Sequence, residues 1–154
     1  MPRDEITIRE AAAIDVPKIV RLVEQYWQFE GIEGFDPARV ATLLEQILAR
    51  GHLGIVWVAQ SGEACVGYLI AVLVMSLEHQ GLMAEIDEFF VVPEARAQGA
   101  GRQLLLAAER GLTQAGCVRL QLQLGVENAA ARRFYERHGY ASRDGYELMD
   151  KALD

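Results

Sequence analysis

The stretch that decides the fold is residues 89–102, Phe-Phe-Val-Val-Pro-Glu-Ala-Arg-Ala-Gln-Gly-Ala-Gly-Arg. The apolar run over residues 86–92 is typical of a strand, and it ends at Pro93. A short loop then leads directly into an amphipathic helix expected over residues 100–115. A glycine-bearing loop at a helix N-terminus presents backbone N–H groups beside the positive end of the helix dipole. We therefore expect residues 96–102 to hold a phosphate group.

Three kinds of phosphate-binding loop compete for this stretch. A P-loop requires Gly-Lys-Ser/Thr, whereas Gly101 is followed by Arg102 and Gln103. A dinucleotide-binding loop requires a third glycine at the position of Leu104, and it normally follows an N-terminal strand. The third pattern, Arg/Gln-x-x-Gly-x-Gly/Ala, matches residues 96–101 at every defined position. The loop thus resembles the acyl-CoA pyrophosphate loop of the GNAT superfamily of N-acetyltransferases, although a tight turn is the ordinary alternative.

A second motif strengthens this resemblance. Residues 128–140 are similar to the GNAT segment Asn-x-x-Ala-x-x-Phe/Leu-Tyr-x-x-x-Gly-Phe/Tyr, and the interval after the loop leaves room for a helix and a strand. Residues 7–11 with Asp15 resemble the opening strand and first-helix cap of the family. Ala95 and Ala97 depart from its common residues but keep their backbone N–H groups. The resemblance covers nearly the whole chain.

The resemblance and the residue pattern together predict an α/β fold. We expect one GNAT-like N-acetyltransferase domain over residues 1–154, with a mixed central sheet of about seven strands and about four helices. The resemblance further implies that the strand before the loop and the next strand splay apart and hold CoA between them. The pattern places strands at residues 6–10, 54–60, 64–75, 83–92, 118–124, 139–143 and 146–152, and helices at residues 15–30, 36–50, 100–115 and 128–138.

Composition excludes several other classes of protein. The chain has 154 residues, of which 51% are hydrophobic, so disorder is excluded. A net charge of −7 leaves no basic stripe for nucleic acid. No apolar run reaches the roughly 18 residues of a membrane span, and the N-terminus lacks a signal-peptide core, so we expect a cytoplasmic protein. Scattered histidines and two cysteines, expected to be buried thiols, predict no metal site.

The resemblance implies acetyl-CoA as the co-substrate. The strand backbone at Phe90, Val91 and Val92 is expected to pair with pantetheine in the manner of an added strand. The amides around the glycines are expected to bind the pyrophosphate, and nearby arginines to contribute charge. A solvated helix face is the alternative for Arg132 and Arg133. The remaining candidates for binding CoA are Arg96, Gln98, Gly99, Ala100, Gly101, Arg102 and Asn128.

The reaction can use an acid and a base, and the sequence offers candidates for both roles. Tyr135 falls on the motif tyrosine, which in this family lies near the CoA sulfur; a phenol stays protonated at neutral pH and can protonate a leaving thiolate. Core packing is the alternative for Tyr135. Asp87 and Glu88 lie on a mainly apolar strand, where an unpaired buried carboxylate is costly, so at least one should border a wet cleft. We assign the base to Glu88, with Asp87 as second choice.

The acceptor pocket is expected at the end of the first helix and in nearby loops. Aromatic and acidic side chains there suit a cationic or aromatic amine, although each is individually more often a rim or core residue. The candidates are Tyr26, Trp27, Phe29, Glu30, Glu78, His79, Asp87 and Tyr146.

The predicted function is transfer of an acetyl group from acetyl-CoA to a primary amine of a small molecule by direct attack. Two alternatives stay open: acetylation of a peptide or protein amine, and a non-catalytic acyl-CoA-binding sensor. Retention of Tyr135 and Glu88 argues against the sensor, because binding alone requires neither. The sequence is compatible with a homodimer but contains no stripe that demands one, and it does not identify the acceptor.

Overall fold

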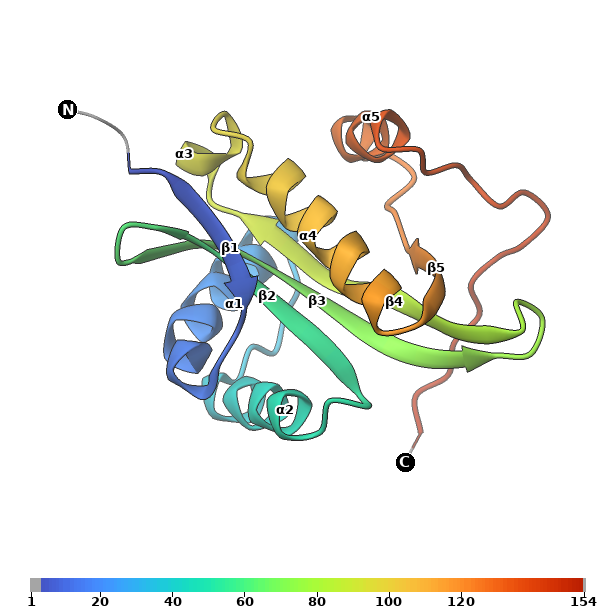
Figure 1. Cartoon of the computed structure of the whole chain (residues 1–154), viewed down its shortest axis with the longest axis horizontal. Coiled ribbons are helices and arrows are strands. Elements are labelled where there is room, and N and C mark those ends of the chain that lie inside the picture. The colour runs from blue at the N-terminus through green and yellow to red at the C-terminus, as the bar shows by residue number, and fades with distance from the viewer. Residues whose placement is uncertain (1–3, 154) are drawn as a thin grey trace. The chain divides into compact units, whose positions relative to one another are not determined.

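The computed structural model describes residues 4–153 in two compact units, one ending at Leu122 and the other beginning at Gln123. These residues form five strands and five α-helices, with one 3-10 turn at Ala13–Asp15. The elements follow one another along the chain as labelled in Figure 1: β1 (Ile6–Glu10), α1 (Val16–Glu30), α2 (Pro37–Ala49), β2 (Gly54–Ser61), β3 (Ala64–Ser76), β4 (Gly81–Val91), α3 (Pro93–Arg96), α4 (Ala100–Gln114), β5 (Cys117–Leu122) and α5 (Ala129–Arg137).

The first unit is built on a mixed sheet in the order β1-β2-β3-β4-β5. The strands β1 to β4 pair antiparallel, whereas β4 and β5 are parallel. Parallel neighbours require a crossover connection, and α4 supplies it. The expected α/β class with a mixed sheet is therefore confirmed, and α4 begins just beyond the end of β4 (Figure 1).

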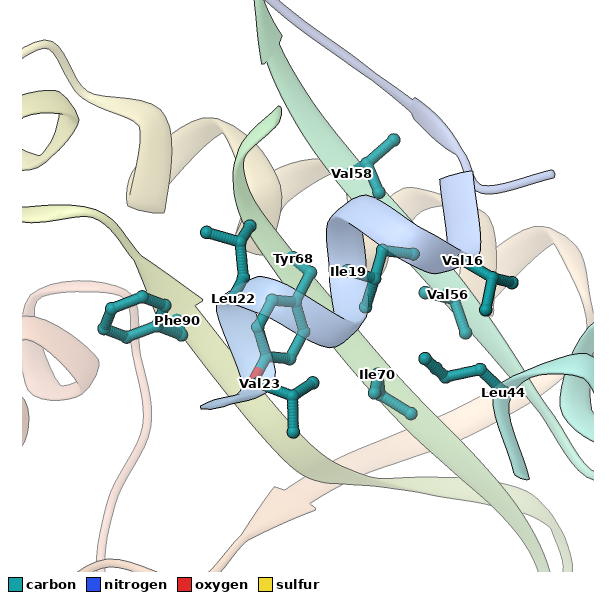
Figure 2. Close-up of a cluster of buried hydrophobic side chains, with 10 residues drawn as sticks. All are labelled: Val16, Ile19, Leu22, Val23, Leu44, Val56, Val58, Tyr68, Ile70 and Phe90. Atoms are coloured by element: carbon teal, nitrogen blue, oxygen red, sulfur yellow. The ribbon is translucent and has the colours of Figure 1, made fainter. Parts of the chain in front are cut away.

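One face of the sheet is covered by α1 and α2. Ile19, Leu22 and Val23 follow the spacing of one helix face and are buried. They meet strand side chains from alternate positions, among them Tyr68 and Phe90, because successive strand residues point to opposite faces. Figure 2 shows this cluster, in which side chains of α1 meet those of β2, β3 and β4. The cluster fixes the position of α1 over the middle of the sheet.

The opposite face is covered by α4. Leu104, Leu105, Ala108 and Leu112 of α4 are buried at helical spacing. At Gly111 the helix approaches β2 so closely that an added Cβ would lie 2.8 Å from Cζ2 of Trp57. The glycine is required there by space, and the contact fixes α4 against the sheet.

The two ends of β4 differ in their pairing. Ile70 pairs with Glu88 and Ala71 pairs with Ile86, so Asp87 is an unpaired, bulged residue. Pairing with β5 ends at Ile86 and Leu122, although β4 continues to Val91. Within residues 4–122, residues 88–91 of β4 therefore have a strand partner on the β3 side only.

The expected counts of seven strands and four helices are wrong. Residues 139–143 and 146–152 form no strand, and the turn after Pro93 is a short helix, α3. Alternating side chains indicate a strand only where another strand edge is available, and the local pattern does not contain that information. Pro93, with its fixed φ, suits the first position of a helix, which explains the additional turn.

The second unit contains α5, whose first turn is capped by Asn128. The side-chain Oδ1 of Asn128 accepts a hydrogen bond of 3.1 Å from the N–H of Ala131. The helix ends before Gly139, whose φ of 89° favours glycine. The expectation of a single domain over the whole chain stays a prediction. No helix among the described residues is long and apolar enough to cross a membrane.

Candidate functional site

A glycine in a left-handed conformation connects α3 to α4. Gly99 is the N-cap of α4 with φ 79° and ψ 15°. An added Cβ at this position would meet no atom within 4 Å. Glycine is thus required here by the backbone conformation, and the space above it is open.

The first turn of α4 provides the free backbone donors of the loop. The N–H groups of Gln98 and Gly99 donate to carbonyl oxygens within α3, at 3.1 and 3.3 Å. The first intrahelical bond runs from the N–H of Gln103 to the oxygen of Gly99, at 3.0 Å. Helix geometry therefore leaves the N–H groups of residues 100–102 without an intrahelical partner. These three donors, at the positive end of a four-turn helix, fit a pyrophosphate group.

The Arg96 side chain lies between two aromatic rings. Its Cζ is 5.5 Å from the ring centre of Phe29 and 5.7 Å from that of Phe90. Its Nε donates to the carbonyl oxygen of Val91 at 2.9 Å. Arg96 thus connects the loop to the end of α1 and to β4, a contact that the sequence did not predict. Its expected role in phosphate binding stays a prediction.

The backbone of Val92 takes part in the local fold. Its N–H donates to the oxygen of Val66 at 2.9 Å, and its oxygen accepts from the N–H of Ala95 at 3.0 Å. The Gln98 side chain likewise donates to the oxygen of Glu94, at 3.1 Å. The carbonyl oxygens of the two preceding residues are also close to other groups, because that of Val91 accepts from Arg96 and that of Phe90 lies beside Gly67 of β3. The expected pairing of Phe90, Val91 and Val92 with pantetheine stays a prediction.

A carboxylate held by two neutral donors forms the second part of the site. The indole Nε1 of Trp27 donates to Oε2 of Glu88 at 2.9 Å, and the hydroxyl of Tyr68 donates to Oε1 at 2.9 Å. Tyr68 is fully buried, whereas Trp27 and Glu88 are half-buried. The three residues come from β3, α1 and β4, so the packing of α1 on the sheet fixes the arrangement.

Burial and hydrogen bonding act on Glu88 in opposite directions. Burial raises the pKa of Glu88, and the negative charge of Asp87 raises it further. The hydrogen bonds from Trp27 and Tyr68 lower this pKa, because they favour the ionised carboxylate. Loss of hydration also raises the pKa of Asp87, although this bulged residue keeps exposed surface. The result is a pair of adjacent carboxyl groups whose affinity for a proton exceeds that of ordinary surface acids.

Further aromatic rings pack near Trp27 and Tyr68, the two residues that donate to Glu88. Ring centres lie 5.9 Å apart for Tyr26 and Phe90, 6.4 Å for Tyr68 and Phe90, and 5.6 Å for Trp27 and Phe35. The pKa of Tyr26 is raised by burial and by nearby carboxylates, so its phenol stays neutral. Aromatic rings beside a carboxylate are suited to an amine.

Tyr68 and Phe35 were missed as members of this site. A tyrosine in the apolar run 67–72 was a usable signal, because a buried phenol requires a hydrogen-bond partner. Phe35 gave no such signal, since its contact with Trp27 depends on the path of the loop between α1 and α2.

Other predicted residues lie apart from Glu88 or in the second unit. Glu78 and His79 lie in the turn between β3 and β4, which Figure 1 shows at the other end of β4 from α3. The seven residue steps from Gly81 to Glu88 span about 23 Å at the usual rise of a strand. In the second unit, Nη1 of Arg132 donates to Oγ of Ser142 at 2.9 Å. The ring of Tyr135 lies 5.3 and 5.5 Å from those of Phe134 and Tyr140. The roles of Tyr135, Arg132 and Asn128 stay predictions.

No group of three or more His, Cys, Asp or Glu side chains that could hold a metal ion occurs within residues 4–153. Cys65 and Cys117 are half-buried free thiols.

Comparison with known proteins finds acetyltransferases. Residues 17–140 match the model of the Acetyltransferase (GNAT) family. The chain is 30% identical over 148 residues to the uncharacterized N-acetyltransferase YhfO of Bacillus subtilis, covering 92% of this chain and 93% of the relative. It is 37% identical over 81 residues to the aminoalkylphosphonate N-acetyltransferase of Salmonella typhimurium, covering 53% of this chain and 52% of the relative.

Solved structures share the fold. An integron cassette protein from the mobile metagenome of Cole Harbour Salt Marsh superposes with a TM-score of 0.82 at 31% identity, covering 96% of this chain and 90% of that protein. The aminoglycoside N-acetyltransferase AAC(6')-Iy, in complex with CoA, superposes with a TM-score of 0.82 at 20% identity, covering 99% of each chain.

Proposed function

Because the chain belongs to the GNAT family of acetyltransferases, we propose that it transfers an acetyl group from acetyl-CoA to a primary amine of a small molecule. Family membership makes it an acyl-CoA-dependent acyltransferase. The observation that carries the proposal is the position of Glu88 on the half of β4 that leads directly into the anion site at the start of α4.

The first turn of α4 binds the pyrophosphate of the co-substrate in this proposal. The N–H groups of Ala100, Gly101 and Arg102 donate to its oxygens, and Gly99 leaves the approach open. The part of β4 that continues beyond its pairing with β5, at Phe90 and Val91, pairs with the pantetheine arm. When bound, acetyl-CoA supplies the thioester whose acetyl group is transferred.

Glu88 and Tyr135 move the two protons of the reaction. Glu88 takes the proton that the amine loses as its nitrogen bonds to the acyl carbon, directly or through a water molecule. Tyr135 gives its proton to the sulfur as the carbon–sulfur bond breaks. A carboxyl group with a raised pKa suits the role of base, because general bases work best when their pKa approaches the working pH. Asp87 is the second choice, since its pKa is also raised.

The surroundings of Glu88 favour a small cationic amine as acceptor. The end of α1 carries Tyr26, Trp27 and Glu30. The charges of Asp87 and Glu88 on β4 raise the pKa of Tyr26, so they act on this end of the helix. Aromatic rings and carboxylates both attract a protonated amine. The name of one relative, aminoalkylphosphonate N-acetyltransferase, also refers to a small amine as the acceptor.

The test is release of free CoA thiol from acetyl-CoA in the presence of acceptors. The panel contains short alkyl diamines, an aminoalkylphosphonate, an aminoglycoside and a peptide with a free N-terminus. We expect release with at least one small amine and none with the peptide. Release with the peptide alone would overturn the small-molecule acceptor, and no release with any acceptor would favour the non-catalytic acyl-CoA-binding alternative.

A further inference from the structure

The Glu88 carboxylate is held by hydrogen bonds that a general base does not require. Each carboxylate oxygen accepts one hydrogen bond, from Trp27 of α1 and Tyr68 of β3. Within residues 4–122, no lysine or arginine forms an ion pair with Glu88. A half-buried carboxylate without a cation is costly unless neutral donors replace the lost hydration. Two donors from two different elements do so here.

We propose that Trp27 and Tyr68 are positioning residues that fix the plane of the Glu88 carboxylate and keep it ionised for the acceptor amine. This inference rests on the proposed role of Glu88 as the base. An ionised carboxylate has about four lone-pair sites, and the two donors occupy one on each oxygen. One site on each oxygen is left for the acceptor or for a water molecule.

The two donors differ in chemistry. The indole N–H of Trp27 is only a donor, so it always favours the oxygen with more negative charge. The hydroxyl of Tyr68 can rotate and accept a hydrogen bond from a protonated carboxyl group, so it serves both forms of Glu88. Trp27 should therefore lower the pKa of Glu88 more than Tyr68 does.

Other titratable groups face Glu88 and define the background. Asp87 on the same strand raises the pKa of Glu88. Burial raises the pKa of Tyr26 of α1, and the charges of Glu30, Glu88 and Asp87 raise it further, so this phenol stays neutral. Burial and Glu88 also raise the pKa of Tyr68, which remains a phenol. The phenols of Tyr26 and Tyr68 therefore stay neutral, and the charged groups of this site are carboxylates.

The direct test measures the titration of Glu88 without any acceptor. The protein is labelled with ¹³C at the glutamate side-chain carboxyl, and the Glu88 signal is assigned by its absence in Glu88→Gln. Removing either donor should raise the pKa, because the hydrogen bonds favour the ionised form. We expect Trp27→Phe to raise it by about one pH unit and Tyr68→Phe by less, from the usual strength of a hydrogen bond to a charged group.

Trp57→Phe is the matched control, because it removes the buried indole of β2, which lies against Gly111 of α4 on the other face of the sheet. It should leave the titration of Glu88 unchanged. A Glu88 pKa that stays unchanged or falls in both Trp27→Phe and Tyr68→Phe would overturn the inference.

A titration of the wild-type protein tests the same hydrogen bond if the variants fail to fold. The indole N–H signal of Trp27 in a ¹⁵N spectrum should move with the same pH midpoint as the Glu88 carboxyl signal. The indole signal of Trp57 should not follow that midpoint. An indole signal of Trp27 that ignores the titration of Glu88 would contradict the hydrogen bond on which the inference depends.

The pH dependence of kcat/KM then tests whether the position of the Glu88 carboxylate matters for the reaction. Glu88 must be ionised to take a proton, so kcat/KM falls as pH drops below its pKa. Trp27→Phe should move this acid limb to higher pH, with activity regained as pH rises, and acetyl-CoA affinity should stay the same. A purely structural loss would lower activity at every pH and would contradict the inference. Failure to bind acetyl-CoA would instead overturn the proposed function and leave the NMR titration standing.

Discussion

The start of α4 and the surroundings of Glu88 are made of different chemical groups. The start of α4 offers backbone N–H groups and a glycine, and no side chain is needed to form it. The surroundings of Glu88 consist of side chains from α1, β3 and β4. The first depends on local chain geometry, whereas the second depends on the packing of distant segments. Binding of the donor and the proton transfer can therefore be separated by mutation.

The largest effect is expected from Gly99→Val. Its side chain would occupy the open space above the first turn of α4 and would strain a backbone with φ 79°. Losing the charge-assisted hydrogen bonds of two or three amides should weaken acetyl-CoA binding by about a thousandfold or more. Isothermal titration calorimetry measures the affinity.

Gly116→Val is the matched control for this change. Gly116 has φ 96°, its added Cβ would also meet nothing within 4 Å, and it lies at the other end of α4. Both variants carry a similar backbone strain of about 1–2 kcal/mol. Equal loss of acetyl-CoA binding in both variants would show that strain, rather than a blocked anion site, is responsible.

Glu88→Gln should act on turnover rather than on donor binding. Loss of a general base typically lowers the rate by about a hundredfold or more, and we expect kcat to fall by about that factor. The affinity for acetyl-CoA should be unchanged, because Glu88 is not part of the start of α4. Steady-state thiol release and calorimetry measure the two quantities. Glu85→Gln, on the paired half of β4, is the control. Full activity in Glu88→Gln would show that Glu88 is not the base, and that either Asp87 is the base or the reaction requires none.

Tyr135→Phe should have a smaller effect on turnover. The variant keeps the ring that contacts Phe134 and Tyr140 but loses the proton for the leaving thiolate. We expect kcat to fall by about tenfold, less than the roughly hundredfold typical for loss of an acid or base, because a thiol is itself fairly acidic and its thiolate leaves with little help from an acid. Acetyl-CoA affinity should stay nearly the same. Tyr140→Phe removes a neighbouring phenol and serves as control. Unchanged turnover of Tyr135→Phe across a pH series would show that Tyr135 is not the acid.

The smallest effect is expected from Phe29→Leu, which probes the contact between the two regions. Phe29 is 68% exposed, yet its ring lies 5.5 Å from Cζ of Arg96. Loss of a solvent-exposed cation–π contact costs about 0.5–1 kcal/mol. Urea unfolding should show a loss of this size, while Ile14→Ala, another exposed apolar residue, should change stability less. A loss no greater than that of Ile14→Ala would show that the Arg96–Phe29 contact contributes nothing to stability.

The parts of the fold that depend on local pattern were predictable. The helix after the glycine loop was expected at residues 100–115 and is Ala100–Gln114. The strand before it was expected at residues 83–92 and is Gly81–Val91. Helical spacing, strand alternation and the positions of proline and glycine are short-range signals, and they define such elements well. They also indicated the family, which the comparisons confirm.

Features that depend on distant contacts were not predictable. Trp27 and Glu88 are 61 residues apart in sequence, and no local rule indicates that the indole donates to that carboxylate. The bulge at Asp87 depends on the register between β3 and β4. The two terminal strands were wrongly predicted for the same reason, since alternation does not show whether a partner edge is available. Arg96 was assigned by its place in the loop, whereas its side chain lies between two rings.

The central claim is that the start of α4 binds the phosphates of acetyl-CoA independently of Glu88. Calorimetric titration of acetyl-CoA into the wild-type protein, Gly99→Val and Glu88→Gln tests it most directly, with NAD and ATP as control ligands. We predict micromolar binding to the wild-type protein and to Glu88→Gln, and no detectable binding to Gly99→Val or of the control ligands. Absence of acetyl-CoA binding to the wild-type protein, or equal binding to Gly99→Val, would contradict the claim.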